Sequence, residues 1–392
     1  MKRRTKIATG VIAATLLLAG CGATTLEGTA GSSTSTDTST STTTEQTGSS
    51  TTTTVDTTVS GVDVDWSALP TTDVTLTDDG LTITAAGTYV LTGSSTGQVV
   101  VDTDGAVRLI LNGVTIDSSD GAAIQVDSAE LTVIELADGS TNTVSDAGTR
   151  SDEEIDGAIY SSDDLYITGT GSLTITANFA DGIVGKDDLW ILGGTISVTS
   201  VDDGIRGKDS LTISGGTLTI DAAGDALKSS NDTDAGKGVL TITGGDITIT
   251  AGDDAIKAEQ ALSITGGTID ITTSVEGIEA PVIVIDGGTI SLYASDDGIN
   301  ASASAIVTSG LSITINGGDI TIEMGSGDTD AIDSNGDLTI TGGTLDITAQ
   351  SSFDYDGTGT MTGGDITVNG STVTQLTNSM MGGGGGGGGG RR

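Results

Sequence analysis

Acidic side chains recur about every 22 residues from Asp181 onward in this 392-residue sequence, with inserted loops that lengthen the step to 29 before Asp254 and to 33 before Asp330. Asp203 follows Asp181 by 22 residues, and Glu276 follows Asp254 by the same step. The equivalent positions form one series: Asp181, Asp203, Asp225, Asp254, Glu276, Asp297 and Asp330. If such repeats stack about 4.8 Å apart, neighbouring carboxylates repel by roughly 1 kcal/mol in water and by more near protein. The series therefore requires either cations beside it or raised pKa values.

Basic residues accompany this acidic series in the early repeats. The position three residues after the acid holds Arg206, Lys228 and Lys257, and the position two residues after Arg206 holds Lys208, with Lys186 as its counterpart one repeat earlier. These five are most of the eight bases between the N-terminal segment and the terminal arginines. We predict that they bind acidic sugars. The competing interpretation is that they only neutralise the acids.

The later repeats place Glu279, Asn300 and Asp333 where the early ones have a base, so a metal ion is the expected counter-charge there. Calcium takes six to eight oxygen ligands at about 2.4 Å, and two stacked carboxylates about 4.8 Å apart can share one ion. The predicted ligands are Asp202, Asp203, Asp225, Asp253, Asp254, Glu276, Glu279, Asp296, Asp297, Asn300, Asp330 and Asp333. The alternative for any one of these acids is an Asp-Gly turn in which the side chain bonds the backbone without an ion.

Two aromatic side chains occupy one outward position in consecutive repeats. Tyr166 lies between Leu165 and Ile167, and Trp190 lies between Leu189 and Ile191. We predict that the two rings stack on sugar faces. The alternative is that they only cover the side of the fold.

The composition excludes several functional classes. The chain has 54 acids against 14 bases, and phosphate contacts require clustered Lys and Arg, so nucleic acid is not an expected partner. No histidine is present, which rules out serine–histidine catalysis.

The elements that must position these side chains are short strands. Each repeat holds Leu-x-Ile or Ile-x-Ile segments with strand periodicity, separated by Gly-Gly pairs that we interpret as turns. A unit of about 22 residues with three short strands is one coil of a solenoid. We therefore predict an all-β fold, a right-handed parallel β-helix over residues 62–370, and a monomer. Residues 62–144 lack the regular repeat; we assign them to the cap and first coils, with a separate β-sandwich as the alternative.

The two ends of the chain predict an exported, lipid-anchored protein. Residues 1–20 have a basic start and a short apolar stretch typical of a secretory signal, and Leu18-Ala19-Gly20-Cys21 resembles a bacterial lipobox. That resemblance implies acylation of Cys21 and attachment to the membrane at the bacterial cell envelope or surface. Residues 21–61 are rich in Ser and Thr and are predicted to be a disordered tether, and residues 371–392 a disordered Gly-rich tail.

The run from Asp181 to Ala301, with its Asp-Gly-Ile-x-Gly-Lys-Asp and Gly-Gly-Thr-Ile repeats, resembles the bacterial surface carbohydrate-binding β-helix family. Members of that family resemble polysaccharide lyases in fold. The similarity continues back through Gly87-Thr-Tyr-Val-Leu and Leu111-Asn-Gly-Val and covers about residues 62–370. It implies calcium between coils and binding of cellulose and of polygalacturonate-type sugars, without established catalysis. The later coils depart from the Gly-Lys-Asp pattern at Glu279 and Asn300, so the resemblance does not extend sugar binding to them.

We therefore expect a cell-surface lipoprotein that binds acidic or cellulosic polysaccharide, with structural calcium. A different function that fits the residues is a calcium-dependent polysaccharide lyase, in which the metal acidifies the proton to be removed and Arg206, Lys228 or Lys257 acts as the base. A passive adhesin or stalk also fits, as does ice binding through outward Thr-x-Thr arrays such as Thr248 and Thr250.

Overall fold

The computed structural model describes residues 61–327 and 329–378. The predicted signal segment, the acylation site at Cys21, almost all of the predicted tether and the glycine run lie outside these residues. Within them the structure is nearly all β, with one short 3-10 helix, η1 (Trp66–Ala68), near the start. None of the described residues forms a helix long and apolar enough to cross a membrane.

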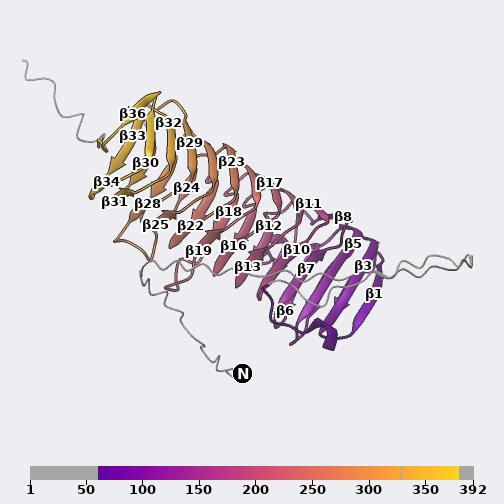
Figure 1. Cartoon of the computed structure of the whole chain (residues 1–392). Helices are drawn as coiled ribbons and strands as arrows, with labels where there is room; N and C mark the ends of the chain where they lie inside the picture. The colour runs from indigo at the N-terminus through magenta and orange to yellow at the C-terminus, as the bar shows by residue number, and fades with distance from the viewer. Residues whose placement is uncertain (1–60, 328, 379–392) are drawn as a thin grey trace, which may run out of the picture. The chain divides into compact units, whose positions relative to one another are not determined.

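Three columns of parallel strands run through the described residues, and one strand from each column makes a coil (Figure 1). We call these columns the first, second and third ladders. The first ladder contains β2 (Leu81–Ile83), β4 (Val99–Asp102), β6 (Ile124–Ser128), β9 (Gly157–Ser161), β12 (Asp181–Gly185), β15 (Ile205–Gly207), β18 (Leu227–Ser229), β21 (Ile256–Ala258), β24 (Ile278–Glu279), β27 (Ile299–Ala301), β30 (Asp330–Ser334) and β33 (Ser351–Tyr355).

The second and third ladders follow the first in every regular coil. The second contains β7 (Thr132–Leu136), β10 (Leu165–Gly169), β13 (Asp188–Ile191), β16 (Ser210–Ile213), β19 (Val239–Ile242), β22 (Ala261–Ile264), β25 (Val282–Ile285), β28 (Ser312–Ile315), β31 (Asp337–Ile340) and β34 (Gly359–Met361). The third contains β8 (Thr141–Ser145), β11 (Ser172–Ala177), β14 (Thr195–Ser200), β17 (Thr217–Ala222), β20 (Asp246–Ala251), β23 (Thr268–Thr273), β26 (Thr289–Ala294), β29 (Asp319–Met324), β32 (Thr344–Thr348) and β35 (Asp365–Val368).

The N-terminal strands belong to the same β-helix. The strands β1 (Thr71–Leu76), β3 (Gly87–Ser95) and β5 (Val107–Asp117) pair in parallel, and β5 also pairs in parallel with both β7 and β8. In the first ladder, β6 pairs with β9 in parallel. The prediction that residues 62–144 form the first coils is therefore confirmed, and the β-sandwich alternative is wrong.

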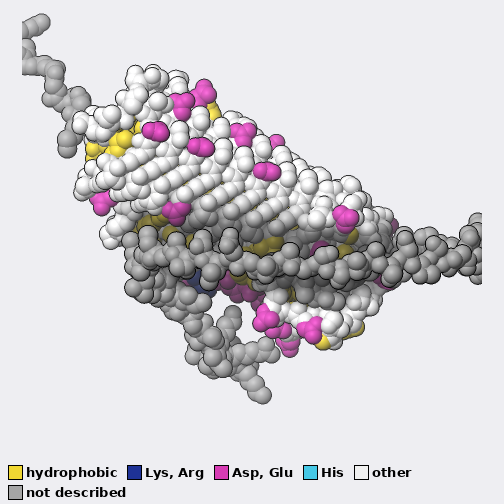
Figure 2. Space-filling model, viewed as in Figure 1, with side chains coloured by type: hydrophobic (Ala, Val, Ile, Leu, Met, Phe, Trp, Pro, Cys, Tyr) yellow, Lys and Arg dark blue, Asp and Glu magenta, His cyan; other side chains and the backbone are white. Residues whose placement is uncertain are grey.

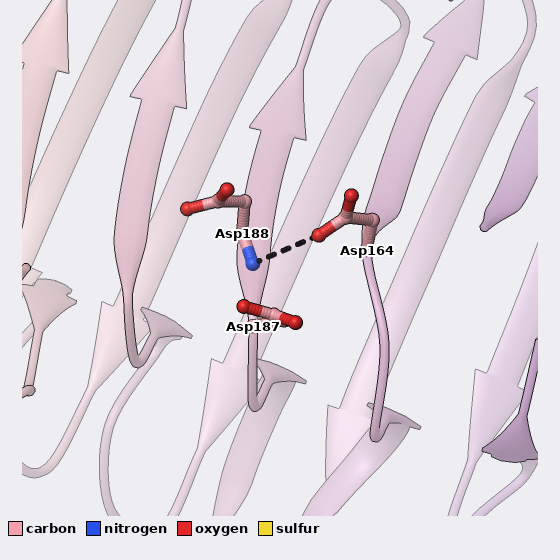
Figure 3. A group of neighbouring side chains, drawn as sticks. All are labelled: Asp164, Asp187 and Asp188. Atoms are coloured by element: carbon pink, nitrogen blue, oxygen red, sulfur yellow. Dashed lines mark hydrogen bonds between the residues drawn. The ribbon is translucent and has the colours of Figure 1, made fainter. Parts of the chain in front are cut away.

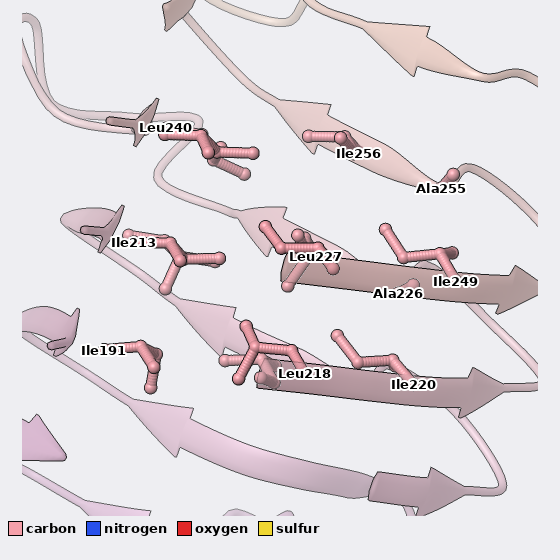
Figure 4. Packing of buried hydrophobic residues seen from close by; sticks show 14 of the residues in the cluster. Ile191, Ile213, Leu218, Ile220, Ala226, Leu227, Leu240, Ile249, Ala255 and Ile256 are labelled. Atoms are coloured by element: carbon pink, nitrogen blue, oxygen red, sulfur yellow. The ribbon is translucent and has the colours of Figure 1, made fainter. Parts of the chain in front are cut away.

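The core is built from alternate side chains that point inward from all three ladders. In one coil these are Ile205, Leu211, Ile213, Leu218 and Ile220, each no more than 1% exposed. Figure 4 shows such residues stacked in columns from coil to coil. Burying each of these side chains is worth about 1.5–3 kcal/mol relative to leaving it in water. The in-register stacking fixes which side chains point outward, because a slip by one residue would reverse the faces.

The Gly-Gly pairs form the turn between the second and third ladders. Gly216 has φ +94°, a conformation that side chains with a Cβ rarely adopt. A Cβ on Gly215 would lie 2.8 Å from the carbonyl oxygen of Leu192 in the preceding coil. Both glycines are thus required by the turn, as predicted.

The C-terminal boundary differs from the prediction. The strand β36 (Ser371–Val373) pairs antiparallel with β35, and the side-chain amide of Asn378 donates a hydrogen bond of 2.5 Å to the carbonyl oxygen of Tyr355. Residues just after 370 are therefore part of the folded end and not of a tail. The composition there is polar, which is why the boundary was placed too early.

Candidate functional site

The acidic series lies at the turn that leads from the third ladder into the first, and we call it the lead column. Its early members are buried: Asp181 is 2% exposed and Asp254 is 3% exposed. The carboxylates of Asp181, Asp203 and Asp225 each accept a hydrogen bond from the backbone N–H of the next acid. Asp203 N donates to Asp181 Oδ1 at 3.1 Å, and Asp225 N donates to Asp203 Oδ1 at 3.0 Å. The backbone-bonding alternative therefore accounts for part of the column's role.

Basic side chains of the first ladder neutralise the early part of this column. The guanidinium of Arg206 contacts the carboxylates of Asp156 and Asp181, with Nε 2.7 Å from Asp181 Oδ2. Lys228 Nζ lies 3.1 Å from Asp203 and 2.8 Å from Asp225. Burial disfavours the charge on both bases, but the adjacent carboxylates outweigh it and raise the pKa of Arg206 and of Lys228.

Lys257 extends this neutralisation further than the sequence indicated. Its ammonium lies 2.6 Å from Asp254 Oδ2 in its own coil and 2.5 Å from Glu279 Oε2 in the next. Glu279 was grouped with the base-free later coils, and that assignment is wrong. Sequence spacing shows which residues share a column, but not that a long lysine side chain reaches along the axis to the following coil.

A surface hollow of about 430 Å³ lies over the first ladder beside these ion pairs. It is lined by Asp156, Ala180, Asp181, Lys186, Asp202, Asp203, Arg206, Lys208, Lys228 and Ser230. Four of the five predicted sugar-binding bases thus meet in one place, and Lys257 is not among the lining residues. On the face shown in Figure 2, acidic groups are scattered over polar surface, and basic atoms are seen only beside acidic ones.

The four bases of the hollow differ in how firmly they are held. Lys186 Nζ is 3.4 Å from Asp156 and lies 5.5 Å from the centre of the Tyr160 ring. Lys208 is exposed and makes no ion pair within the described parts of the chain. Arg206 and Lys228 are ion-paired with acids of the lead column, whereas the ammonium of Lys208 is available to a ligand.

Two groups of acids have carboxylate oxygens close enough to hold a metal ion. They are Asp225 with Asp253 and Asp254, and Asp254 with Glu276 and Glu279, and the oxygens within each group lie within 4.8 Å of one another. Burial, followed by the hydrogen bond to Glu279, raises the pKa of Asp254 to about 8. Burial, followed by the charge of Glu279, raises the pKa of Glu276 to about 7. A cation at either group would stabilise the charged carboxylates, which burial and the neighbouring acids destabilise.

The donor set around Glu276 fits calcium. Asn300 donates a hydrogen bond of 3.1 Å from Nδ2 to Glu276 Oε2, while its side-chain oxygen Oδ1 is buried without a hydrogen-bond partner. Carboxylate and amide oxygens are ligands that calcium prefers. Lys257 already contacts two acids of this group, so its ammonium and a metal compete for the same charge.

The remaining predicted ligands are more dispersed. Among the described residues, Asp202, Asp203, Asp296, Asp297, Asp330 and Asp333 belong to no group of three acids with oxygens this close. Burial and the neighbouring carboxylates nevertheless raise the pKa of Asp297 to about 6 and of Asp333 to about 7. These later coils carry negative charge that no described basic side chain offsets.

A third acidic group, which the sequence reasoning missed, lies at the turn between the first and second ladders (Figure 3). It consists of Asp164, Asp187 and Asp188, and Asp188 N donates to Asp164 Oδ1 at 3.4 Å. Ser210 Oγ donates to Asp188 at 2.7 Å. The Asp-Asp pairs that precede the Leu-x-Ile segments were the available signal, but only the register of the strands shows that their carboxylates meet.

The aromatic pair lies on the second ladder, away from the ladder that carries the bases of the hollow. Tyr166 and Trp190 are register partners, and their rings stack on each other with centroids 4.3 Å apart and planes 5° from parallel. Tyr166 also packs against the cluster that contains Trp66 and Val133. One ring face of each residue is thus occupied by the other, and the pair is not brought together with Lys186.

Comparisons with known proteins identify the family of this chain. A family model described as "Carbohydrate-binding domain-containing protein" matches residues 77–329 and 275–380. A protein of that description from Acetivibrio thermocellus is 41% identical over 124 residues, which is 30% of this chain and 43% of the relative. The chain therefore matches less than half of that relative's length. A solved polysaccharide lyase-like protein from C. thermocellum, a gadolinium derivative, has 30% identity and a TM-score of 0.49, covering 68% of this chain and 96% of the other. Because the family model matches most of its residues, this chain belongs to the carbohydrate-binding domain-containing proteins.

Proposed function

We propose that this protein binds an acidic polysaccharide of the polygalacturonate type in the hollow over the first ladder. The observation that carries the proposal is the gathering of Lys186, Arg206, Lys208 and Lys228 around one hollow, in a chain whose net charge is −40. A uronate polymer is repelled by most of such a surface, so it can approach where these bases converge.

The two sides of the hollow have different roles in this proposal. Arg206 and Lys228 form a fixed floor, because each is held between carboxylates. Lys208 and Lys186 supply donors to the sugar carboxylates, since neither is enclosed by two close ion pairs. Asp202 in the same lining is exposed and is available to accept hydrogen bonds from sugar hydroxyl groups, whereas Asp181 and Asp203 are buried and already hydrogen-bonded or ion-paired.

Calcium, export and lipid anchoring are further parts of the proposal. The acids around Glu276 and the buried side-chain oxygen Oδ1 of Asn300 support a structural calcium ion between β21, β24 and β27. Such an ion would stabilise the coils that lack basic side chains. The signal-like start and the residues around Cys21 support anchoring of the protein at the cell envelope.

Binding is better supported than elimination chemistry. A lyase of the kind considered above requires Arg206, Lys228 or Lys257 to lose its proton and act as a base. Burial alone would favour that loss, but the neighbouring carboxylates outweigh it and raise the pKa of all three. Each base is thus held in its charged form, which suits a sugar carboxylate and not proton removal.

The test compares two substitutions that change the net charge equally. Lys208→Gln removes one positive charge from the hollow, and Thr219→Glu adds one negative charge on the exposed side of β17 in the third ladder. We expect Lys208→Gln to weaken polygalacturonate binding about two- to fivefold at low salt, as for an exposed ion pair. Thr219→Glu should have little effect, and both variants should melt like the parent. Equal affinities for parent and Lys208→Gln would contradict the proposed site.

A further inference from the structure

The loop before β9 is fastened across the outer side of the first ladder. Ile155 packs against Ala122, Tyr160 and Val184, which are outside the main core and are covered in part by this loop. Arg150 has a side chain that is 1% exposed, and its guanidinium contacts Asp146 and the carbonyl oxygens of Ile155 and Gly157. The loop over residues 146–156 is therefore a fixed part of the surface.

The hollow begins where this loop ends. Asp156 is the last residue of the loop and one of the lining residues, and it is held there by Arg206 and Lys186. The preceding residues Asp152, Glu153 and Glu154 are exposed and acidic. The loop therefore closes the N-terminal end of the hollow and places negative charge there.

The opposite end of the hollow has a different character. Its last lining residues are Lys228 and Ser230, and the next outward position along the first ladder is another base, Lys257. From the level of β9 to that of β18 there are three strand-to-strand steps, which is about 14 Å. A hexose advances a polysaccharide by about one such step, so the hollow takes roughly three sugars.

We infer that the hollow binds the terminal segment of a uronate chain, of roughly three sugars, and not an internal stretch of the polymer. The chain end abuts the 146–156 loop, and the rest of the polymer leaves past Lys228 toward Lys257. An internal segment would have to continue across Ile155 and along Asp152, Glu153 and Glu154, where its carboxylates meet like charge. This inference rests on the proposed function and adds the part of the polymer that is recognised.

The experiment uses the full chain and galacturonate probes of increasing length. Calorimetric titrations with trigalacturonate, hexagalacturonate and intact polygalacturonate measure affinity per uronate and per chain. If ends are bound, all three probes share one affinity per chain, and affinity per uronate falls as the chain lengthens. Titration of Lys208→Gln with the trimer should show the same loss as with the polymer.

The possible outcomes separate the inference from the function on which it rests. If affinity per uronate is constant beyond the trimer, internal segments bind and the inference is overturned while the proposed function stands. If polymer binds but trimer and hexamer do not, the terminal-segment inference is likewise overturned. If no galacturonate binds at all, the proposed function itself fails.

Discussion

Replacing Arg206 with Gln should reveal how far the fold depends on its internal counter-charges. Arg206 contacts Asp156 and Asp181 and lies 3.6 Å from Asp203. The substitution leaves these three carboxylates without their main cation. Asp181 is the most affected, because its side chain is only 2% exposed and cannot regain water in place of the guanidinium.

The size of the effect follows from the burial of the pair. Removing one partner of a buried ion pair costs about 3–5 kcal/mol. Arg206 is 15% exposed and Asp156 is 25% exposed beside an open hollow, so water replaces part of the lost interaction. We therefore expect the lower value, about 3 kcal/mol of unfolding free energy at pH 8.

The loss should depend on pH in a defined direction. Burial raises the pKa of Asp181 from 3.8 to about 6 even with Arg206 present. Because the folded state then binds this proton more tightly than the unfolded state, stability falls as pH rises through that window, by about 3 kcal/mol in all. Without Arg206 the pKa of Asp181 rises further, and the window extends to higher pH. The difference between parent and variant should be small at pH 5 and largest at pH 8.

Urea unfolding at both pH values, followed by circular dichroism, measures this difference without adding salt. The control is Lys208→Gln. Lys208 lines the same hollow but makes no ion pair among the described residues. That variant should change stability by less than about 0.5 kcal/mol. The reasoning is refuted if Arg206→Gln is as stable as Lys208→Gln at pH 8, or if its loss is greater at pH 5.

Three further outcomes are expected. Calcium should raise the melting temperature at pH 8 relative to chelator, and the gain should shrink at pH 5, because Glu276, with a pKa of about 7, is then protonated; equal melts at pH 8 would exclude the site. Lys257→Gln should enlarge the calcium-dependent gain, because its ammonium no longer contacts Asp254 and Glu279; calorimetric calcium titrations of parent and variant check this. Replacing both Tyr166 and Trp190 with Ala should lower the melting temperature, since a stacked pair contributes about 0.5–1.5 kcal/mol beyond area burial, and a cellulose pull-down shows whether the pair also binds glycan.

The fold was predictable because the hydrophobic pattern, the polar pattern and the turn residues all indicate the same coil. Inward Leu and Ile, outward polar residues and the Gly-Gly turns repeat together, so a single register satisfies all of them. Once the register is known, the order Arg206, Lys228, Lys257, Glu279 and Asn300 along one outward position follows directly. The lead column and its bases were thus predictable from the sequence.

What could not be predicted depends on side-chain direction and on irregular segments. Register places Lys257 opposite Glu279, but only rotamers decide whether the ammonium turns back to Asp254, forward to Glu279 or contacts both. Likewise it placed Tyr166 beside Trp190 without showing that they stack on each other. The 146–156 loop has no repeat counterpart, so its position over Tyr160 and Val184 carried no sequence signal.

The Gly-Gly turn limits where residues can be inserted into this β-helix. The long insertions in the later coils, residues 230–238 and 302–311, lie between the first and second ladders. The turn between the second and third ladders keeps its two glycines from Gly193-Gly194 to Gly363-Gly364, because the preceding coil leaves no room there. We therefore expect an inserted peptide to be tolerated between the first and second ladders and to disrupt the fold between the second and third. Removing a whole unit, such as residues 203–224, should rejoin equivalent positions and yield a β-helix shorter by one coil.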